Sequence, residues 1–321
     1  MLHRRSFLSR IALLFAACVP GVRADGYPAR PIRMVVPFAP GSATDSMARV
    51  LAQELTQRLG QTVIVDNRAG AFGQIAAHQV ARSTPDGYTL ILTTNTTHSA
   101  NPHLYRALPY DPIRDFEPIA RLATLPFMLV AAPSFPARTL RELLDYARAR
   151  PGQITYAAAS STALVAAKTF ETLGQLKLIG VSYKASPQAV LDVASGQVQM
   201  MMADFVTAMP HVIAGRLRVF GVTTTGRSAL VPDAPPIAET LPGFDVGSWN
   251  GLFAPAGTPK DIVARLARET DQILARPETR TRLAGIGFEV APLGSEALGR
   301  YVREQLQHWG RLVREAGIQP E

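Results

Sequence analysis

Short apolar runs alternate with amphipathic segments from residue 32 onward, and this alternation constrains the fold more than any other feature. Residues 32–38 form a brief apolar run bounded by prolines, which is typical of a buried strand. Apolar residues then recur every three or four positions over 44–59, which predicts a helix. A strand at 61–66, a helix at 75–80 and a strand at 88–93 continue the order. Such an order predicts a parallel sheet with right-handed crossovers.

A second series of alternating units starts at residue 127. Strands are predicted at 127–132, 154–158, 179–183, 198–202 and 217–223, with helices between them. A Pro- and Gly-rich stretch at 231–247 then leads to the segment SWNGLFA at 248–254, and helices are predicted at 259–275, 278–284 and 295–316. Because these last helices have no strands of their own, we expect them to cover an existing sheet.

The two series predict an α/β protein with two lobes, and 321 residues suit two domains. We expect residues 25–126 with 248–321 in lobe 1 and residues 127–247 in lobe 2. Because the chain would leave lobe 1 and return to it, two connecting segments would form a hinge. A cleft between hinged lobes is a preferred place for a ligand.

Residues 1–24 have the pattern of an export signal peptide. A basic start at 1–10 precedes an apolar run at 11–17 that is too short to span a membrane. We expect cleavage after Ala24 and a periplasmic location. The sequence RRSFL at 4–8 also fits a twin-arginine signal, so Sec and twin-arginine export both remain open.

The single cysteine and the charge exclude several classes of protein. Phe15 stands where a lipid-attachment motif has an aliphatic residue, so no lipid anchor is expected at Cys18. One cysteine forms neither an intramolecular disulfide nor a thiolate metal site. Four of the 33 basic residues and none of the 25 acidic ones lie in 1–24, which leaves 29 basic against 25 acidic residues. No basic stripe is interleaved with aromatic residues, so nucleic-acid binding is not expected.

The loop at 37–45 joins the first predicted strand to the first predicted helix. The first N–H groups of a helix lack partners within the helix, and the helix dipole adds about half a positive charge there. Gly41 allows close approach to the main chain, and Ser42 and Thr44 supply hydroxyls. The alternative is that Ser42 or Thr44 only caps the helix while Asp45 complements the dipole. We predict a bound carboxylate or another anion at Phe38, Ala39, Pro40, Gly41, Ser42 and Thr44.

Three further polar loops follow predicted strands. Their shared position at strand ends in two lobes suggests one ligand site, although each loop alone fits ordinary turn chemistry. His98, next to the first of these loops, is expected to be structural rather than a catalytic base. The candidate ligand-binding residues in these loops are Thr94 and Asn95, Ser160, Ser161 and Thr162, and Asp204.

Motifs of familiar enzymes are absent from the sequence. There is no GxGxxG after a strand, no phosphate-binding GxxxxGK[ST], no HExxH and no GxSxG. The histidines lack metal-ligand spacing, and nothing in the sequence shifts the pKa values of Asp45 and Asp204 apart for acid–base work. We therefore expect no catalytic residues, no metal and no cofactor.

An ordered set of short motifs runs through the chain after the signal. It comprises PFAPGSATD (37–45), NRAGAFG (67–73), PDGY (85–88), LPYDP (108–112), YK (183–184), MPH (209–211), SW (248–249), APAGTP (254–259) and AGIQP (316–320). The set resembles the Bug-type solute receptors of tripartite tricarboxylate transporters. The resemblance implies a type II periplasmic-binding-protein fold and capture of a carboxylated small molecule between the lobes. It also implies that main-chain N–H groups and hydroxyls at 38–44 and 160–162 hold the carboxylate, and that inner-membrane permease subunits are partners.

Some positions depart from the pattern of that family. The loop at 157–165 is shortened, with Leu164 where a histidine is usual, and Ser42 replaces a favoured glycine. The familiar substrates of the family are therefore not transferred to this chain. Two other functions remain open: the same receptor could present its closed form to a sensor histidine kinase, or an enzyme could use the same scaffold.

Overall fold

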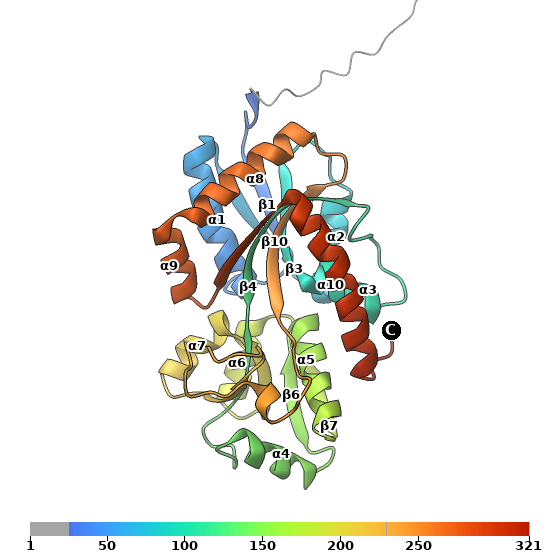
Figure 1. The fold of residues 1–321 in the computed structure, drawn as a ribbon, viewed down its shortest axis with the longest axis vertical. Helices are drawn as coiled ribbons and strands as arrows, with labels where there is room; N and C mark the ends of the chain where they lie inside the picture. Colours follow the sequence, from blue (N-terminus) through green and yellow to red (C-terminus); the bar gives the residue numbers. More distant parts are fainter. Residues whose placement is uncertain (1–25, 229, 321) are drawn as a thin grey trace, which may run out of the picture.

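The computed structural model describes residues 26–228 and 230–320 (Figure 1). The predicted signal peptide at 1–24, with Cys18, lies outside the described residues. Two sheets with their helices are stacked along the long axis of the molecule (Figure 1). We call each sheet with the helices packed on it a lobe, and the predicted two-lobed α/β architecture is confirmed.

The first sheet has six strands in the order β11-β4-β10-β3-β1-β2. Their bounds are β1 Ile32–Val36, β2 Val63–Asn67, β3 Thr89–Thr94, β4 Phe116–Leu125, β10 Ser248–Pro255 and β11 Glu289–Gly294. β1 pairs in parallel with both β2 and β3, as the sequence predicts. β10 runs antiparallel to β3 and β4, and β11 antiparallel to β4. The parallel arrangement predicted for the first three strands is confirmed, and the sheet is mixed because β10 and β11 run opposite to the other four strands.

The sequence pattern did not indicate β4 and β11, because each contains a proline. Pro118 lies within β4 next to a shift in its pairing register with β10. Pro292 lies within β11, where the pairing with β4 shifts between Val290 and Leu293. Proline lacks the N–H that a ladder needs and is tolerated at such irregularities.

The second sheet has five strands in the order β7-β6-β8-β5-β9. Their bounds are β5 Phe127–Ala131, β6 Ile154–Ala158, β7 Leu178–Ser182, β8 Met200–Asp204 and β9 Arg218–Val222. β6 is parallel to β7 and β8, and β5 is antiparallel to β8 and β9. Each lobe therefore places the carboxyl ends of its parallel strands at one edge of its sheet.

Helices connect the strands close to the predicted positions. In the first lobe they are α1 Ala43–Leu59, α2 Gln74–Ala81, α3 Asn101–Leu104, α8 Lys260–Ala275, α9 Pro277–Gly285 and α10 Ser295–Glu315. In the second they are α4 Leu140–Arg148, α5 Ser161–Leu173, α6 Ser186–Ala194 and α7 Phe205–Ile213. Gly60 ends α1 in the left-handed conformation, at φ 67°. The last helices pack on strands of the first sheet, since α8 and α10 both contact β4.

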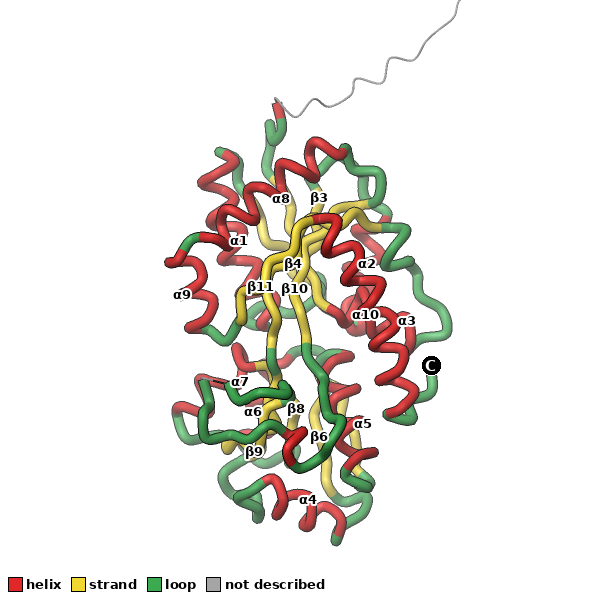
Figure 2. The backbone as a smooth tube through the Cα atoms, viewed as in Figure 1, coloured by secondary structure: helices red, strands yellow, loops and turns green. Residues whose placement is uncertain are grey.

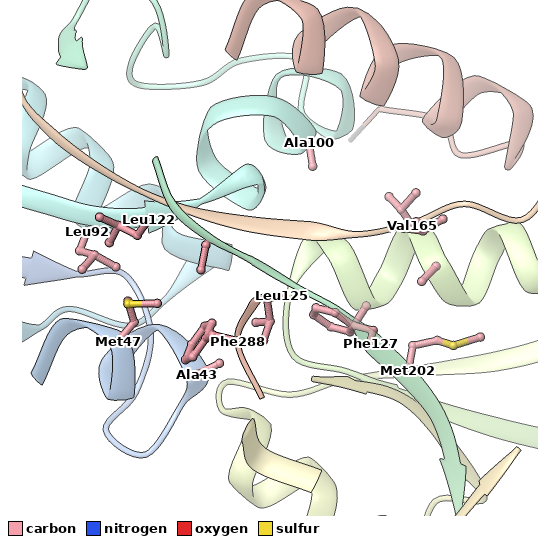
Figure 3. Packing of buried hydrophobic residues seen from close by; sticks show 14 of the residues in the cluster. Ala43, Met47, Leu92, Ala100, Leu122, Leu125, Phe127, Val165, Met202 and Phe288 are labelled. Atoms are coloured by element: carbon pink, nitrogen blue, oxygen red, sulfur yellow. The ribbon is translucent and has the colours of Figure 1, made fainter. Parts of the chain in front are cut away.

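The lobes are joined at two main-chain crossings (Figure 2). Pro126 alone separates β4 from β5, and Phe127 exchanges hydrogen bonds with Thr223, which follows β9. The chain returns through β10. One hydrophobic cluster contains buried residues of both sheets. In Figure 3, Leu125 lies on the side of Ala43 and Phe288, and Phe127 lies on the side of Met202.

Within the described residues, none of the helices combines the length and apolar character needed to cross a membrane.

Candidate ligand-binding site

A small polar cavity of about 30 Å³ lies between the lobes. A buried water needs roughly 10–15 Å³ of such space, so this arrangement has room for about two waters. A larger guest therefore requires the lobes to separate. The lining residues are Phe38, Ser42, Ala43, Thr44, Thr94, Thr96, Leu125, Phe127, Ser160, Thr162, Ser186, Asp204 and Ser248.

The N-terminus of α1 forms one side of the cavity. Ser42 caps the helix, and its Oγ accepts a hydrogen bond from the Asp45 N–H at 3.3 Å. The N–H of Gly41 donates to Asp45 Oδ2 at 3.0 Å, so that amide is already paired within the loop. No acceptor among the described residues pairs with the N–H groups of Ala43 and Thr44. These two amides are the donors that α1 offers to a guest.

The N-terminus of α5 forms a second side of the cavity, from the other lobe. Ser160 caps this helix by accepting from the Ala163 N–H at 3.2 Å. The N–H groups of Ser161 and Thr162 have no acceptor in the described part of the chain. Two helix N-termini, one from each lobe, thus point their positive ends at one cavity.

Side-chain hydrogen bonds cross between the lobes beside the cavity. Asn95 Nδ2 donates to Thr162 Oγ1 at 2.9 Å, and Ser161 Oγ donates to Asn101 Oδ1 at 2.6 Å. Ser248 Oγ donates to Asn95 Oδ1, which fixes the amide orientation. These bonds hold the lobes together around the cavity.

Thr96 contributes an unused hydroxyl to the lining. It opens a π-helix over Thr96–Ala100, a rare conformation that is frequent at functional sites. Thr96 is buried, and its Oγ1 has no hydrogen-bond partner in the described structure. Because a buried hydroxyl without a partner is costly, this atom points to a polar guest.

Asp204 is the acidic residue of the cavity. It caps α7, and its Oδ1 accepts from the Thr207 N–H at 2.9 Å. The side chain of Ser186 also hydrogen-bonds its carboxylate. Burial raises the pKa of the Asp204 carboxyl above its usual value, although these hydrogen bonds lower it in part.

Asp45 lies behind the cavity as a structural residue. Its carboxylate binds the Gly41 N–H, Arg49 Nε at 2.9 Å and Asn67 Nδ2 at 3.0 Å. Burial raises its pKa, but the hydrogen bonds from Arg49, Gly41 and Asn67 outweigh burial and hold it below the usual value. Asp45 therefore remains charged and fixes the loop that precedes α1.

His98 is buried away from the lining. Its ring stacks on Phe253 with 4.1 Å between centroids, and Nδ1 lies 2.9 Å from Thr97 Oγ1. Burial lowers the pKa of His98 to about 3. No group of three or more His, Cys, Asp or Glu in the described residues could hold a metal ion.

The structure brings seven of the twelve sequence-predicted residues to the lining: Phe38, Ser42, Thr44, Thr94, Ser160, Thr162 and Asp204. Ala39, Pro40, Gly41, Asn95 and Ser161 are not among the lining residues, and Asn95 and Ser161 instead make the bonds between lobes. Sequence reasoning missed Ala43, Thr96, Leu125, Phe127, Ser186 and Ser248. Ser186 had a usable signal, because it is the first residue of α6 and only three residues separate it from the end of β7.

A second cavity of about 320 Å³ also lies between residues of both lobes, and Phe38 lines it together with the first. Its lining includes Ala71 and Phe72, which both have φ of 45°. Non-glycine residues in this region are strained, and such strain is concentrated at functional sites. Lys184 also lines this second cavity and brings one positive charge to it.

Two α/β lobes around a small polar cavity are the architecture of periplasmic binding proteins, and similar solved structures have this fold. Residues 47–318 match the family described as the tripartite tricarboxylate transporter family receptor, TctC. The chain belongs to this family, and the resemblance inferred from its motifs is confirmed.

One relative is BugT of Bordetella pertussis, 33% identical over 311 residues that cover 96% of this chain and 95% of BugT. A solved structure of Rpa4515 from R. palustris, with adipate, is 34% identical at a TM-score of 0.90, covering 92% of this chain and all of that one. MatC from Rhodopseudomonas palustris, with bound malate, is 34% identical at a TM-score of 0.84, covering 89% and 100%. The chain is therefore a solute-binding receptor of a family of periplasmic proteins.

Proposed function

We propose that this receptor captures a small carboxylated metabolite in the cavity between the lobes and delivers it to an inner-membrane permease. One observation carries the proposal: the N-termini of α1 and α5, from different lobes, line the same cavity with their first amides unpaired. A carboxylate has two oxygens with about four acceptor positions. That number matches the N–H groups of Ala43, Thr44, Ser161 and Thr162.

The chemistry of the lining supports a receptor rather than an enzyme. None of the described lining residues is a histidine, cysteine or lysine that could act as a nucleophile or base. Charge-assisted hydrogen bonds to a carboxylate are worth roughly 1.5–3 kcal/mol each. A few such bonds in a closed cavity are enough for tight and reversible binding without catalysis.

The proposed lobes are residues 25–126 with 248–321 and residues 127–247, with Pro126 at one crossing. The strand assignments support this division, because every described strand of the first sheet lies within 32–125 or 248–294 and every strand of the second within 127–222. The proposed export signal at 1–24 would deliver the receptor to the periplasm. The carboxylates bound by Rpa4515 and MatC support the ligand class.

Replacing Ala43 by proline tests the amide site directly. Ala43 is the first residue of α1, where proline is tolerated, and Ser42 at ψ 162° has the backbone that a residue before proline adopts. The substitution removes one donor and leaves the helix intact. Lys260→Pro is the matched control, because it removes the first N–H of α8, where Lys260 is exposed and outside the cavity lining.

Affinities for a panel of organic acids should be measured by calorimetry on ligand-free protein, with unfolding temperature as a check on folding. Loss of one charge-assisted bond predicts affinity about 10- to 150-fold weaker in Ala43→Pro and unchanged in Lys260→Pro. Unchanged affinity in a folded Ala43→Pro variant would show that the anion lies elsewhere. Uptake assays in a strain lacking the receptor gene test delivery to a permease, and normal uptake in that strain would instead favour a signalling role.

A further inference from the structure

Four strands end the two sheets, and one of them lacks the features that usually block a sheet edge. β11 and β2 end the first sheet, and β7 and β9 end the second (Figure 1). Edge strands commonly carry charged residues, prolines or bulges that prevent pairing with another chain. β11 contains Pro292, β2 contains Asp66 and β9 contains Arg218. β7 has the sequence LIGVS, with neither a charged residue nor a proline.

The free edge of β7 offers main-chain hydrogen-bonding groups. Tyr183, directly after the strand, donates its N–H to the Ala158 carbonyl of β6 at 2.8 Å. Because alternate residues of an outer strand point their main-chain groups toward and away from the sheet, those of Gly180 and Ser182 point away from β6. Neither of these two N–H groups has an acceptor in the described part of the chain. Both residues are exposed, so a further strand has access to them.

Two cavities lie along this edge, and both have walls from both lobes. The second cavity described above is lined by Ser182 and Lys184 of the second lobe and by Phe72 and Tyr105 of the first. A third cavity, of about 310 Å³, shares Phe72, Tyr105 and Ser182 with it and is also lined by Ile318 of the first lobe. An apolar cavity of roughly 150 Å³ holds benzene, so each cavity has room for a large side chain. An added strand presents side chains to one face at every second residue, which suits two adjoining cavities.

Tyr156 is an independent sign of a polar guest at this edge. Its side chain is 1% exposed and lines the third cavity, and its hydroxyl has no hydrogen-bond partner among the described residues. A Cβ on Gly180 would lie 2.8 Å from this hydroxyl, so glycine in β7 leaves room for it beside the strand edge. Because a buried hydroxyl without a partner is costly, a polar group in the third cavity would stabilise the structure.

Two lysines flank β7. Lys177 precedes the strand and Lys184 follows it; both are exposed, and neither forms an ion pair within the described residues. Lys168, which lines the third cavity, is instead paired with Glu171 at 2.7 Å. The edge therefore favours an acidic partner. A second copy of this chain is a poor occupant, because pairing two β7 edges brings the lysines of both copies to one seam.

We propose that the free edge of β7 binds an extended, acidic segment of a partner protein as an added strand, and that this docking requires the closed form of the receptor. Main-chain hydrogen bonds to Gly180 and Ser182 align the segment, and its side chains enter the two cavities. Since Phe72 and Tyr105 belong to the first lobe, separation of the lobes removes one wall of each cavity. The partner thereby distinguishes the closed receptor from the open one. The inference rests on the proposed function in one respect, because the guest that closes the lobes is the carboxylate of the cleft.

The test uses random peptides of about nine residues displayed on phage, since the edge from Lys177 to Lys184 spans eight residues. They are selected on the full-length mature receptor with the acid that binds most tightly in the panel, and in parallel on ligand-free receptor. The enriched peptide is synthesised and titrated by calorimetry into wild type and variants. Ser182→Pro removes one outward N–H at a sheet edge, where proline is tolerated, and Ser182→Ala is the control that keeps the N–H. The unfolding temperature of each variant checks its folding.

We expect enriched peptides to have acidic residues near both ends and apolar residues at alternate positions between them. The peptide should bind Ser182→Ala like wild type and Ser182→Pro about 5-fold or more weakly, because a peptide carbonyl loses its donor. Lys184→Glu should weaken binding about 2- to 5-fold, whereas Lys260→Glu, at an exposed position of α8, should not change it. Omitting the acid should weaken peptide binding, and by linkage the peptide should strengthen acid binding by the same factor.

A selected peptide that binds Ser182→Pro as tightly as Ser182→Ala would overturn the inference, and so would a selection that enriches no peptide. Equal peptide affinity with and without the acid would overturn the dependence on closure. Dimers of wild type that Ser182→Pro dissolves, measured by light scattering, would make a second copy the occupant and overturn the assignment to a partner. If no acid of the panel binds folded wild type, the proposed function fails, and the selection on ligand-free receptor decides separately whether β7 binds a strand.

Discussion

Replacing Gly41 by valine separates the folding of the α1 loop from the closure of the lobes. Gly41 has φ of 79°, a left-handed conformation that favours glycine. A Cβ at this position would lie 3.7 Å from Cγ of Pro187, which belongs to α6 in the other lobe. Alanine therefore makes an ordinary contact across the cleft, whereas the γ carbons of valine extend about 1.5 Å further from the main chain, the length of a C–C bond.

Two costs follow from this geometry. The left-handed backbone costs a residue with a Cβ roughly 1–2 kcal/mol, which lowers the unfolding temperature by about 2–8 °C. Overlap of valine with Pro187 in the closed form costs about 1–3 kcal/mol by comparison with overpacked cores. Because the open form escapes the overlap, this second cost weakens ligand binding by about 5- to 150-fold.

Gly60 provides the matched control. It ends the same helix at φ 67°, and a Cβ there meets no atom within 4 Å. Gly60→Val should lose similar stability and keep wild-type affinity, and Gly41→Ala should also keep its affinity. Thermal unfolding and calorimetric titration of all three variants measure the two costs separately. Equal affinities in Gly41→Val and Gly60→Val would refute the claim that the lobes close at Gly41.

Two further predictions concern pH. Burial lowers the pKa of His98 to about 3, so the neutral ring contributes stability that is present above pH 6.5 and lost as the pH falls toward 3. Over that range, the unfolding free energy of His98→Gln, measured by urea titration, should therefore fall less than that of the wild type. The control is His78→Gln, at an exposed position, whose unfolding free energy should fall as much as that of the wild type. The hydrogen bonds that hold the pKa of Asp45 below its usual value stabilise the fold above about pH 4, and this stability is lost as the pH falls further. Asp45→Asn should therefore be less stable than the wild type at pH 7. Its unfolding free energy should also change less than that of the wild type between about pH 4 and pH 2. An acid dependence identical to wild type in either variant would contradict the corresponding prediction.

Local patterns in the sequence were sufficient to predict most of the elements of both sheets. The apolar spacing of α1, its end at Gly60 and the Thr139 cap of α4, which accepts from the Glu142 N–H, all act over a few residues, and the structure contains all three. β4 and β11 could not be predicted in this way, because their prolines are tolerated only through register shifts with strands distant in the sequence. The antiparallel pairs that β10 forms with β3 and β4, and β11 with β4, depend on the same long-range pairing.

The lining residues of the cavity could be predicted from the sequence where a single loop supplies several polar groups. The loop before α1 and the Ser160 loop have polar residues at a strand end, and both reach the cavity. Leu125, Phe127 and Ser248 reach it only because the two crossings between lobes lie there. The pairing of the Gly41 N–H with Asp45 also depends on tertiary geometry, so spacing alone could not show that this amide is unavailable.

The unpaired amides also explain how a guest can control closure without a cationic side chain. When the lobes close, the N–H groups of Ala43 and Thr44 on one side and of Ser161 and Thr162 on the other lose contact with bulk water around a cavity of about 30 Å³. Each buried donor without an acceptor costs about 1–3 kcal/mol, which works against closure in the absence of a ligand. The proposed carboxylate guest would remove this cost for donors of both lobes at once, so its binding free energy would depend strongly on whether the lobes are closed. A ligand shifts a conformational equilibrium only through such a difference in affinity, and here the difference arises from main-chain atoms that no side-chain substitution except proline removes.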